Sequence, residues 1–313
     1  MSIPTTVPET HDRSGGDARE ALRRAGLRHL AENAARRFHA ADGTSYARAL
    51  GLSSVLSLLP GLIALAGIAT ALDPGSRGVL GHSLENLAPG PAGTFLISGV
   101  QNASSGLRVV LWGLGGMLLS GTFAMLHLER GANRIYGVEE HRPGRRRFLT
   151  AAILASTAGL LLALALGVIV AGEASGGGDG LSVWELVRWP VAVVLVAVPM
   201  TAIFRYAPNR RQPALPWLLS GTSVAVALWI GATLLLALVY ENLATFGSSL
   251  GPVLGVIALL VWAYLTAVAV LYGLAFAAEL ESEGAGQGEP ERDVDAAEDV
   301  VDVRERDEHT VRR

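Results

Sequence analysis

The sequence predicts an all-α membrane protein, a polytopic helical bundle with six transmembrane helices and both termini in the cytoplasm. Hydrophobic residues make up 50% of the 313 positions, charged residues only 17%, and the mean hydropathy is +0.39. Six apolar stretches each reach the length of about 20 residues that a bilayer core requires. These stretches lie near 47–72, 107–128, 148–171, 183–204, 215–240 and 250–278.

Arginine is distributed unevenly among the connections of these stretches, and this predicts their orientation. The connections before the first stretch, after the second and after the fourth are Arg-rich, whereas the others hold almost no basic residue. Cationic loops stay on the cytoplasmic side of a membrane. An even number of spans then places both termini in the cytoplasm. The basic residues are all Arg, which is typical of a GC-rich bacterial genome, so we expect the plasma (inner) membrane of a bacterium.

Composition divides the chain into four parts. Residues 1–18 are rich in Pro, Thr, Ser and Gly and are expected to be disordered. Residues 19–46 are predicted to form a cytoplasmic amphipathic helix, which lies either on the anionic leaflet or on the protein's own loops. The six-span membrane domain covers 47–280. The acidic tail, 281–313, is expected to be disordered, and Glu279 just before it is expected at the membrane interface.

The first two spans contain residues that shape helices. Pro60 removes a backbone donor and predicts a kink in the first span. The long connection 73–106 is expected to form one or two short helices. In the second span, Gly113, Gly116 and Ser120 share one helical face, which favours close packing within the protein. Dimerisation through that face, giving a homo-oligomer, is the alternative.

The remaining spans have ends marked by aromatic or breaking residues. The third span, 148–171, is rich in Leu and Ala and runs into a Gly-rich turn. Trp184 and Trp189 stand at the expected outer end of the fourth span, where aromatic belts form. Pro199 predicts a kink deeper in that span. The fifth and sixth spans follow a Pro-rich turn and an Arg-free connection, respectively.

Several short segments follow one another along the chain in an order that is more informative than any one segment alone. They are Leu56-Ser57-Leu58-Leu59-Pro60, Asn133-Arg134-Ile135-Tyr136, Arg205-Tyr206-Ala207-Pro208-Asn209, Trp217 with Gly221, and Leu260-Val261-Trp262-Ala263-Tyr264 with Gly273. Over roughly residues 25–281 this order resembles the YihY/virulence factor BrkB family, whose members also carry a ribonuclease BN-like label. The resemblance implies an inner-membrane protein related to the envelope or to export. The sequence departs from the family pattern at Leu52, Ser53, Ala275 and Ala277.

The residues do not favour catalysis. There is no Cys, and none of the seven His residues stands at metal-ligand spacing from another. The spans hold no group of carboxylates that could bind metal ions for RNA hydrolysis, and no phosphate-binding Gly-rich loop follows a strand. We therefore expect no enzyme activity, no metal and no cofactor, and ribonuclease activity is the least favoured function. A nucleic-acid partner is not expected either, because no aromatic residues interleave with the Arg residues.

Two functions remain, a transporter or lipid- and envelope-related export protein of unknown substrate, and a non-transporting membrane scaffold. A transporter requires polar side chains that line a cavity or contact headgroups. The candidates are Ser57, Ser120, Thr122, Glu129, Arg134, Thr201, Arg205, Tyr240 and Asn242. The Arg residues at the cytoplasmic rim are expected to bind anionic lipid headgroups, because guanidinium groups match phosphate geometry. The substrate itself is an unknown small molecule or lipid.

Overall fold

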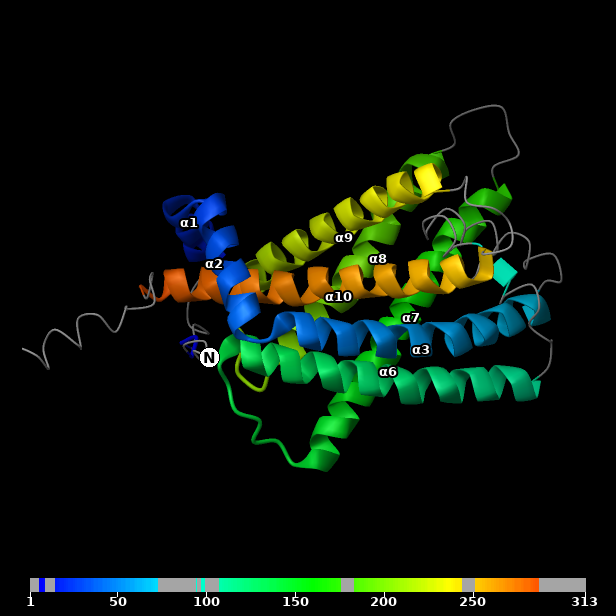
Figure 1. The fold of residues 1–313 in the computed structure, drawn as a ribbon, viewed down its shortest axis with the longest axis horizontal. Helices are drawn as coiled ribbons and strands as arrows, with labels where there is room; N and C mark the ends of the chain where they lie inside the picture. Colours follow the sequence, from blue (N-terminus) through cyan, green and yellow to red (C-terminus); the bar gives the residue numbers. More distant parts are fainter. Residues whose placement is uncertain are drawn as a thin grey trace, which may run out of the picture.

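The computed structural model of the chain describes residues 6–8, 15–72, 94, 97–98, 107–175, 183–243 and 251–286. Within these residues the chain is all-helical, without a strand, which confirms the predicted fold class (Figure 1). The helices are α1 (Gly15–Ala25), α2 (Leu27–Ala40), α3 (Gly43–Leu72), α6 (Leu107–Tyr136), α7 (Gly144–Ser175), α8 (Val183–Tyr206), α9 (Leu215–Leu243) and α10 (Gly251–Gly284).

Five helices are long and apolar enough to cross a membrane, judged by length and composition over the described residues. These candidate spans are Gly43–Ile68, Val110–Tyr136, Gly144–Leu164, Leu215–Tyr240 and Val253–Gly284. Helix α8 contributes a shorter apolar stretch, Val193–Tyr206. The sixth crossing and the cytoplasmic location of both termini therefore stay predictions.

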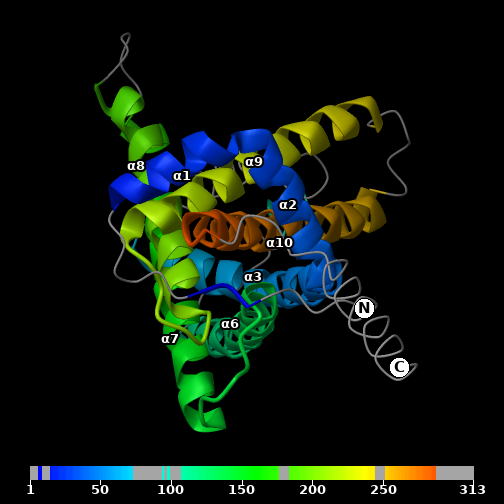
Figure 2. The ribbon, with the colours of Figure 1, turned by 90° about the vertical axis from the view of Figure 1, so that its left-hand side faces the viewer.

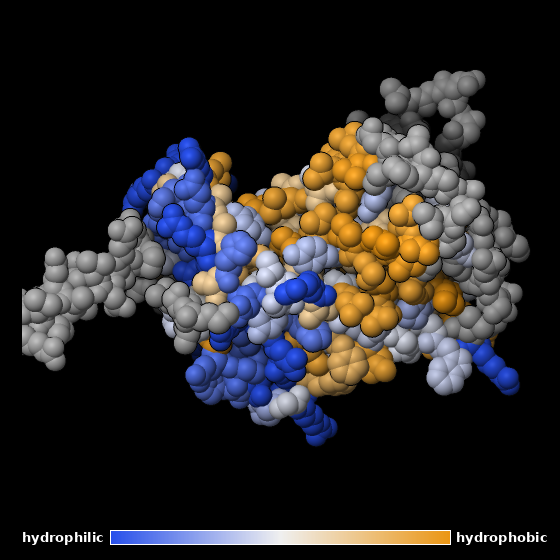
Figure 3. Space-filling model, viewed as in Figure 1, coloured by the Kyte–Doolittle hydropathy of each residue, from blue (hydrophilic) through white to orange (hydrophobic). Residues whose placement is uncertain are grey.

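The long helices pack as neighbours, α3 against α6, α9 against α10, and α7 against α8, with α10 also against α3 (Figure 1). The beginnings of α3 and α9 lie at the same end of the bundle as the ends of α6 and α10, and helices α1 and α2 cover this end (Figures 1 and 2). We call it the charged end and define it as residues 15–50, 129–147, 205–212 and 279–286. In Figure 3 hydrophilic residues gather there, whereas hydrophobic residues cover much of the rest of the visible face.

The surface away from the charged end exposes large apolar side chains. Trp112 is 81% exposed, and Leu160, Leu234 and Leu238 are exposed by about three fifths. Soluble proteins seldom expose contiguous apolar surface of this kind, whereas a bilayer covers it. The exposure is the structural counterpart of the apolar stretches in the sequence.

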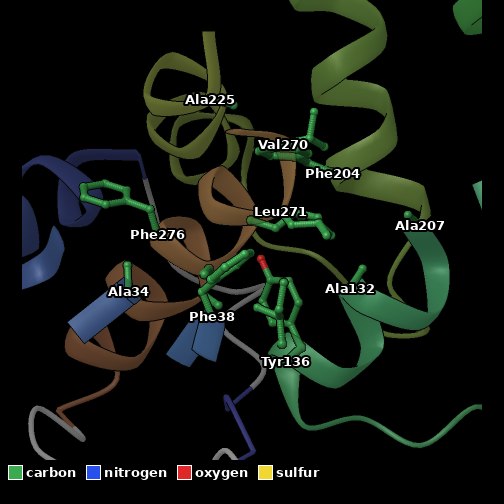
Figure 4. Close-up of a cluster of buried hydrophobic side chains, with 14 of the residues drawn as sticks. Ala34, Phe38, Ala132, Tyr136, Phe204, Ala207, Ala225, Val270, Leu271 and Phe276 are labelled. Atoms are coloured by element: carbon green, nitrogen blue, oxygen red, sulfur yellow. The ribbon is translucent and has the colours of Figure 1, made fainter. Parts of the chain in front are cut away.

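The main core receives buried side chains from all eight described helices and is densest near the charged end, where Figure 4 shows five of these helices. The side chains drawn in Figure 4 include Phe38 of α2, Tyr136 of α6, Phe204 of α8, Ala225 of α9 and Leu271 of α10. All five are buried within one hydrophobic cluster. This core fixes the positions of the helix ends that carry the charged groups.

The N-terminal region forms two helices where the sequence predicted one. The chain breaks at Gly26, whose φ of 78° lies in the left-handed region that glycine tolerates and other residues avoid. The apolar face of α2, made of Leu30, Ala34 and Phe38, is buried against the protein. The Tyr272 hydroxyl of α10 also donates a hydrogen bond to the Ala31 carbonyl, at 2.7 Å. Helix α2 therefore packs on helix α10, and contact of its outer face with the leaflet stays a prediction.

The boundaries of the expected tails also differ. Helix α10 continues to Gly284, so that Glu281 is helical and buried where a disordered tail was expected to begin. Residues 6–8, expected to be disordered, lie against the charged end. The acidic segment 287–313 lies outside the described residues. So does the connection 73–106, apart from 94 and 97–98.

Candidate functional site

Glu129 of α6 is enclosed at the charged end and has no exposed surface. Its Oε2 atom lies 3.3 Å from Nε of Arg147 in α7 and 4.0 Å from Nη2 of Arg142 in the α6–α7 loop. Its Oε1 atom has no hydrogen-bond partner among the described residues. Burying a carboxylate is costly unless cations accompany it. Glu129 therefore serves as an anchor for two Arg side chains that arrive from another helix and a loop.

Glu140, in the α6–α7 loop, carries the second carboxylate close to Arg142. It accepts hydrogen bonds from Nε of Arg142 at 3.0 Å, from Nη2 of Arg142 at 3.1 Å and from Nδ2 of Asn133 at 2.8 Å. Burial raises the pKa of Glu140, but the hydrogen bonds and charge of Arg142, together with Asn133, outweigh burial and hold the pKa below its ordinary value. Glu140 is therefore an ionised partner that orients Arg142.

Hydrogen bonds join the segment after α8 to the end of α6 and the segment that follows it. The Asn209 backbone N–H donates to Oδ1 of Asn133 at 2.7 Å, and Nη2 of Arg142 donates to the Ala207 carbonyl at 3.0 Å. Asn133 is itself only 5% exposed. Both segments carry the sequence patterns that resemble the BrkB family, and the structure brings them into direct contact.

Arg210 and Glu281 form a second buried ion pair, between the segment after α8 and the end of α10. Their side chains are 2% and 0% exposed, and Nη2 of Arg210 lies 2.8 Å from Oε2 of Glu281. The Tyr136 hydroxyl donates to Oε1 of Glu281 at 3.1 Å, and the Arg210 guanidinium lies 4.7 Å from the centre of the Tyr136 ring. Hydrogen bonding and the cation–π contact both offset the loss of hydration.

The N-terminal residues 6–8 close over this ion pair. The Arg210 guanidinium donates to the carbonyls of Val7 and Pro8 at 3.3 and 3.1 Å. The Val7 N–H donates to the Tyr136 carbonyl at 3.2 Å, and its side chain is buried. These bonds occupy the outer donors of Arg210, so this Arg is committed to the structure of the charged end.

A third buried pair joins the N-terminal helices to the bundle. Nε of Arg37 in α2 lies 2.8 Å from Oε2 of Glu279 in α10, and both side chains are less than a tenth exposed. Nη1 of Arg37 also donates to the Ile135 carbonyl at 3.4 Å. Glu279 was expected at a membrane interface, but α2 covers it because Arg37 supplies the opposite charge.

Next to these pairs, the charged end carries an open pocket of about 510 Å³. Its lining is cationic and polar and includes no acidic residue. The lining residues are Arg142, Thr150, Arg205, Tyr206, Pro208, Asn209, Arg210 and Arg211. Thr150 belongs to α7 and Arg205 and Tyr206 to the last turn of α8, so that two helix ends and two connecting segments form the walls.

Ser57 and Ser120, both predicted as cavity residues, instead join α3 to α6. The Ser57 hydroxyl donates to the Met117 carbonyl at 3.1 Å. The Ser120 hydroxyl is shared between the Gly116 carbonyl of its own helix, at 2.5 Å, and the Leu56 carbonyl of α3, at 3.2 Å. In a regular helix the N–H of residue 60 would bond the Leu56 carbonyl, but Pro60 has no N–H. Ser120 of the neighbouring helix places its hydroxyl within hydrogen-bond distance of the acceptor that Pro60 leaves open, and shares it with the nearer Gly116 carbonyl. We call this contact, between residues 56–64 of α3 and 113–121 of α6, the seam.

Glycines bring the two backbones of the seam together. A Cβ atom on Gly113 would lie 2.8 Å from the Pro60 carbonyl oxygen, and one on Gly116 would lie 3.2 Å from the Pro60 Cβ atom. The small face of the second span therefore packs within the chain, the interpretation that the sequence favoured over dimerisation.

The other predicted site residues lie apart from one another. Thr122 bonds the Leu118 carbonyl of its own helix, at 2.6 Å, and Thr201 meets Thr222 across α8 and α9 at 3.2 Å. Arg134 is 4.0 Å from Asp42 with both side chains more than a third exposed, and Tyr240 packs at the edge of a second apolar cluster. The side chain of Asn242 lies outside the described residues. Of the nine candidates, only Arg205 lines the pocket.

The sequence did not predict which residues form the ion pairs and hydrogen bonds that organise the charged end. These are Arg37, Tyr136, Glu140, Arg142, Arg147, Arg210, Glu279 and Glu281. One signal was available, because carboxylates occur close to Arg residues at the Arg-rich ends of the apolar stretches. Such proximity does not identify the partners, since two of the pairs join residues more than 70 positions apart.

Among the residues that the structure describes, no three His, Asp or Glu side chains come together as a metal site. A sequence model of the virulence factor BrkB family matches residues 34–297 of this chain. No solved structure matches the chain significantly.

Two curated proteins are similar over most of the chain. The ribonuclease-like protein YfkH of Bacillus subtilis is 29% identical over 245 residues, which cover 74% of this chain and 88% of YfkH. A UPF0761 membrane protein of Aromatoleum aromaticum is 26% identical over 255 residues, which cover 79% of this chain and 62% of that longer protein.

Proposed function

The chain belongs to the virulence factor BrkB family, and from that premise we propose that it is a transporter or export protein for lipid or other envelope material in the plasma membrane of a bacterium. The similar UPF0761 protein of Aromatoleum aromaticum is described as a membrane protein, which agrees with the apolar helices of this chain. Between small molecules and lipids, we favour a lipid-like substrate.

The observation that carries this proposal is the position of the Arg-lined pocket. Thr150 of α7 lines the pocket, while Leu149 and Ile153 of the same helix are 58% and 56% exposed. A polar, cationic site thus adjoins apolar surface on the same helix. An amphiphile with an anionic headgroup fits both parts, because its headgroup meets the Arg residues while its acyl chains stay against the apolar helix.

The centre of the bundle supports a lipid more than a small polar molecule. Gly221 and Gly273 bring the backbones of α9 and α10 into contact, and the seam does the same for α3 and α6. Ser57 and Ser120 use their hydroxyl groups in bonds between helices. A lipid headgroup that moves along the flank of α7 and α8 needs no wide polar passage between the close-packed helices.

Lipid movement in proteoliposomes tests the proposal. Purified protein would be reconstituted with fluorescent phosphatidic acid or phosphatidylcholine, and a membrane-impermeant quencher would report the fraction of label in the outer leaflet. We expect the protein to bring inner-leaflet phosphatidic acid to the outer leaflet, with Arg205→Gln slowing this movement and Arg36→Gln, an exposed change in α2, leaving it unchanged. Absence of flux of any lipid or solute tested, with folded protein, counts against transport.

The alternative function is a non-transporting scaffold. It draws on the ordered surface that α1 and α2 form by packing on α10 at the charged end. A ribonuclease is the third candidate, and it draws on the name of the Bacillus subtilis relative, a ribonuclease-like protein. RNA cleavage by the purified protein that disappears on substitution of a single carboxylate, such as Glu140→Gln, would establish it in place of transport.

A further inference from the structure

We infer that the Arg-lined pocket is a binding site for a phosphate-type anion, with Arg205 and Tyr206 as the groups that receive it and Arg142 as the group oriented behind them. The inference rests on the proposed function in one respect, because the nearby apolar surface suggests that the anion belongs to a lipid headgroup. The binding site itself can be tested without any transport measurement.

The pocket has the charge and size for such a ligand. Four of its eight lining residues are Arg and none is acidic. The pocket, of about 510 Å³, is wide open to the surface, so that a phosphate group can enter it while the rest of its molecule stays outside. Guanidinium groups bind phosphate through two parallel hydrogen bonds, a geometry that a single ammonium group does not offer.

The hydrogen bonds within the charged end separate the structural Arg residues from a receiving one. Arg210 donates hydrogen bonds to Glu281 and to the carbonyls of Val7 and Pro8, and its side chain is almost fully buried. Arg205, in contrast, is exposed, and its side chain makes no hydrogen bond or ion pair within the described part of the chain. An exposed guanidinium in a cationic pocket is available to an incoming anion.

Arg142 and Tyr206 complete the site from two sides. Glu140 and the Ala207 carbonyl hold Nε and Nη2 of Arg142, and the side chain keeps 19% of its surface exposed. A guanidinium that is already oriented loses little further side-chain entropy when an anion binds. Tyr206 is 56% exposed and brings a hydroxyl group that can donate to a phosphate oxygen.

The experiment measures binding to full-length protein in nanodiscs made of phosphatidylcholine. Three probes would be titrated, namely dioctanoyl phosphatidic acid, inorganic phosphate and dioctanoyl phosphatidylcholine. We expect phosphatidic acid to bind, and Arg205→Gln to weaken its binding by about tenfold or more, because a charge-assisted hydrogen-bond pair is lost. Tyr206→Phe should weaken binding by a few-fold, and Arg36→Gln should change it by less than about twofold.

Each outcome decides the inference. Binding of phosphatidic acid alone assigns the site to a headgroup, whereas equal binding of inorganic phosphate assigns it to the free anion. Equal affinity for phosphatidylcholine, or the same loss in Arg205→Gln and Arg36→Gln, overturns the inference. If Arg205→Gln lowers the melting temperature, Tyr206→Phe serves as the second variant, and an unchanged affinity there is equally contradictory.

The same probes separate this inference from the proposed function. Arg205-dependent binding without lipid movement in proteoliposomes would reject transport and keep the binding site. If the rate of lipid movement is the same for Arg205→Gln as for the unchanged protein, and the same for both headgroups, the binding site is rejected and transport is kept.

Discussion

The charged end and the seam hold helices together in different ways. At the charged end, buried ion pairs join segments distant in sequence, as Arg210 joins Glu281 and Arg37 joins Glu279. At the seam, small residues bring backbones close, and two hydroxyl groups bond carbonyls of the facing helix. The difference indicates that the charged end specifies which segments meet, whereas the seam allows two apolar helices to pack tightly where water is absent.

Breaking a buried ion pair is expected to have the largest effect. Glu281→Ala leaves the Arg210 guanidinium buried without its counter-charge and removes the acceptor of Tyr136. We expect a loss of about 3–5 kcal/mol in the free energy of unfolding, measured by denaturation in mixed micelles. Glu32→Ala, which breaks only an exposed pair with Arg28, should cost less than about 1 kcal/mol. Equal losses would contradict the special role of the charged end.

The second largest loss of stability is expected where a methyl group is added between the closely packed backbones of α9 and α10. A Cβ atom on Gly221 would lie 2.5 Å from the Gly273 carbonyl oxygen, so Gly221→Ala should destabilise the protein by about 1–3 kcal/mol. Gly231 of the same helix has nothing within 4 Å of the corresponding position. Gly231→Ala should therefore be neutral or stabilising by up to about 1 kcal/mol. Melting temperatures of the two variants in the same detergent provide the comparison.

The hydroxyl bond of the seam should contribute less and depend on Pro60. Ser120→Ala removes a hydroxyl group that the Leu56 carbonyl shares with the Gly116 carbonyl of α6, and it is expected to cost up to about 1 kcal/mol. In the Pro60→Ala background the N–H of residue 60 can bond that carbonyl, so the same substitution should cost less. A double-mutant cycle on unfolding free energies measures this coupling. An equal cost of Ser120→Ala in both backgrounds would show that Pro60 is unrelated to the bond.

The smallest expected effect is a pH dependence at Glu140. Its pKa is lower in the folded chain than its ordinary value, so its contribution to stability is fully present above that ordinary value and is lost as the pH falls through the lower pKa of the folded chain. The difference in melting temperature between the unchanged protein and Glu140→Gln should accordingly shrink on acidification. A difference that grows at low pH would mean that the pKa of Glu140 is raised on folding.

The sequence predicted the seam better than the charged end, for a physical reason. The seam depends on local patterns, namely the length of the apolar stretches, the small residues around Gly113 and the helix-breaking Pro60. Each of these patterns constrains its own helix. The pairing of Arg210 with Glu281 depends on which helix ends the tertiary fold brings together, and local spacing does not encode it. Arg205 was predicted because it stands at a span end, whereas Arg142 needed the contact with Glu140 to become visible.

The central claim is that the charged end binds an anion while the seam only supports the bundle, and one paired measurement tests it most directly. Affinity for dioctanoyl phosphatidic acid and the melting temperature would be measured for Arg205→Gln and Ser120→Ala in the same nanodiscs. We predict that Arg205→Gln weakens binding by about tenfold with little change in melting temperature, and that Ser120→Ala lowers the melting temperature with little change in affinity. Unchanged affinity in Arg205→Gln, or an equal loss of affinity in Ser120→Ala, would contradict the claim.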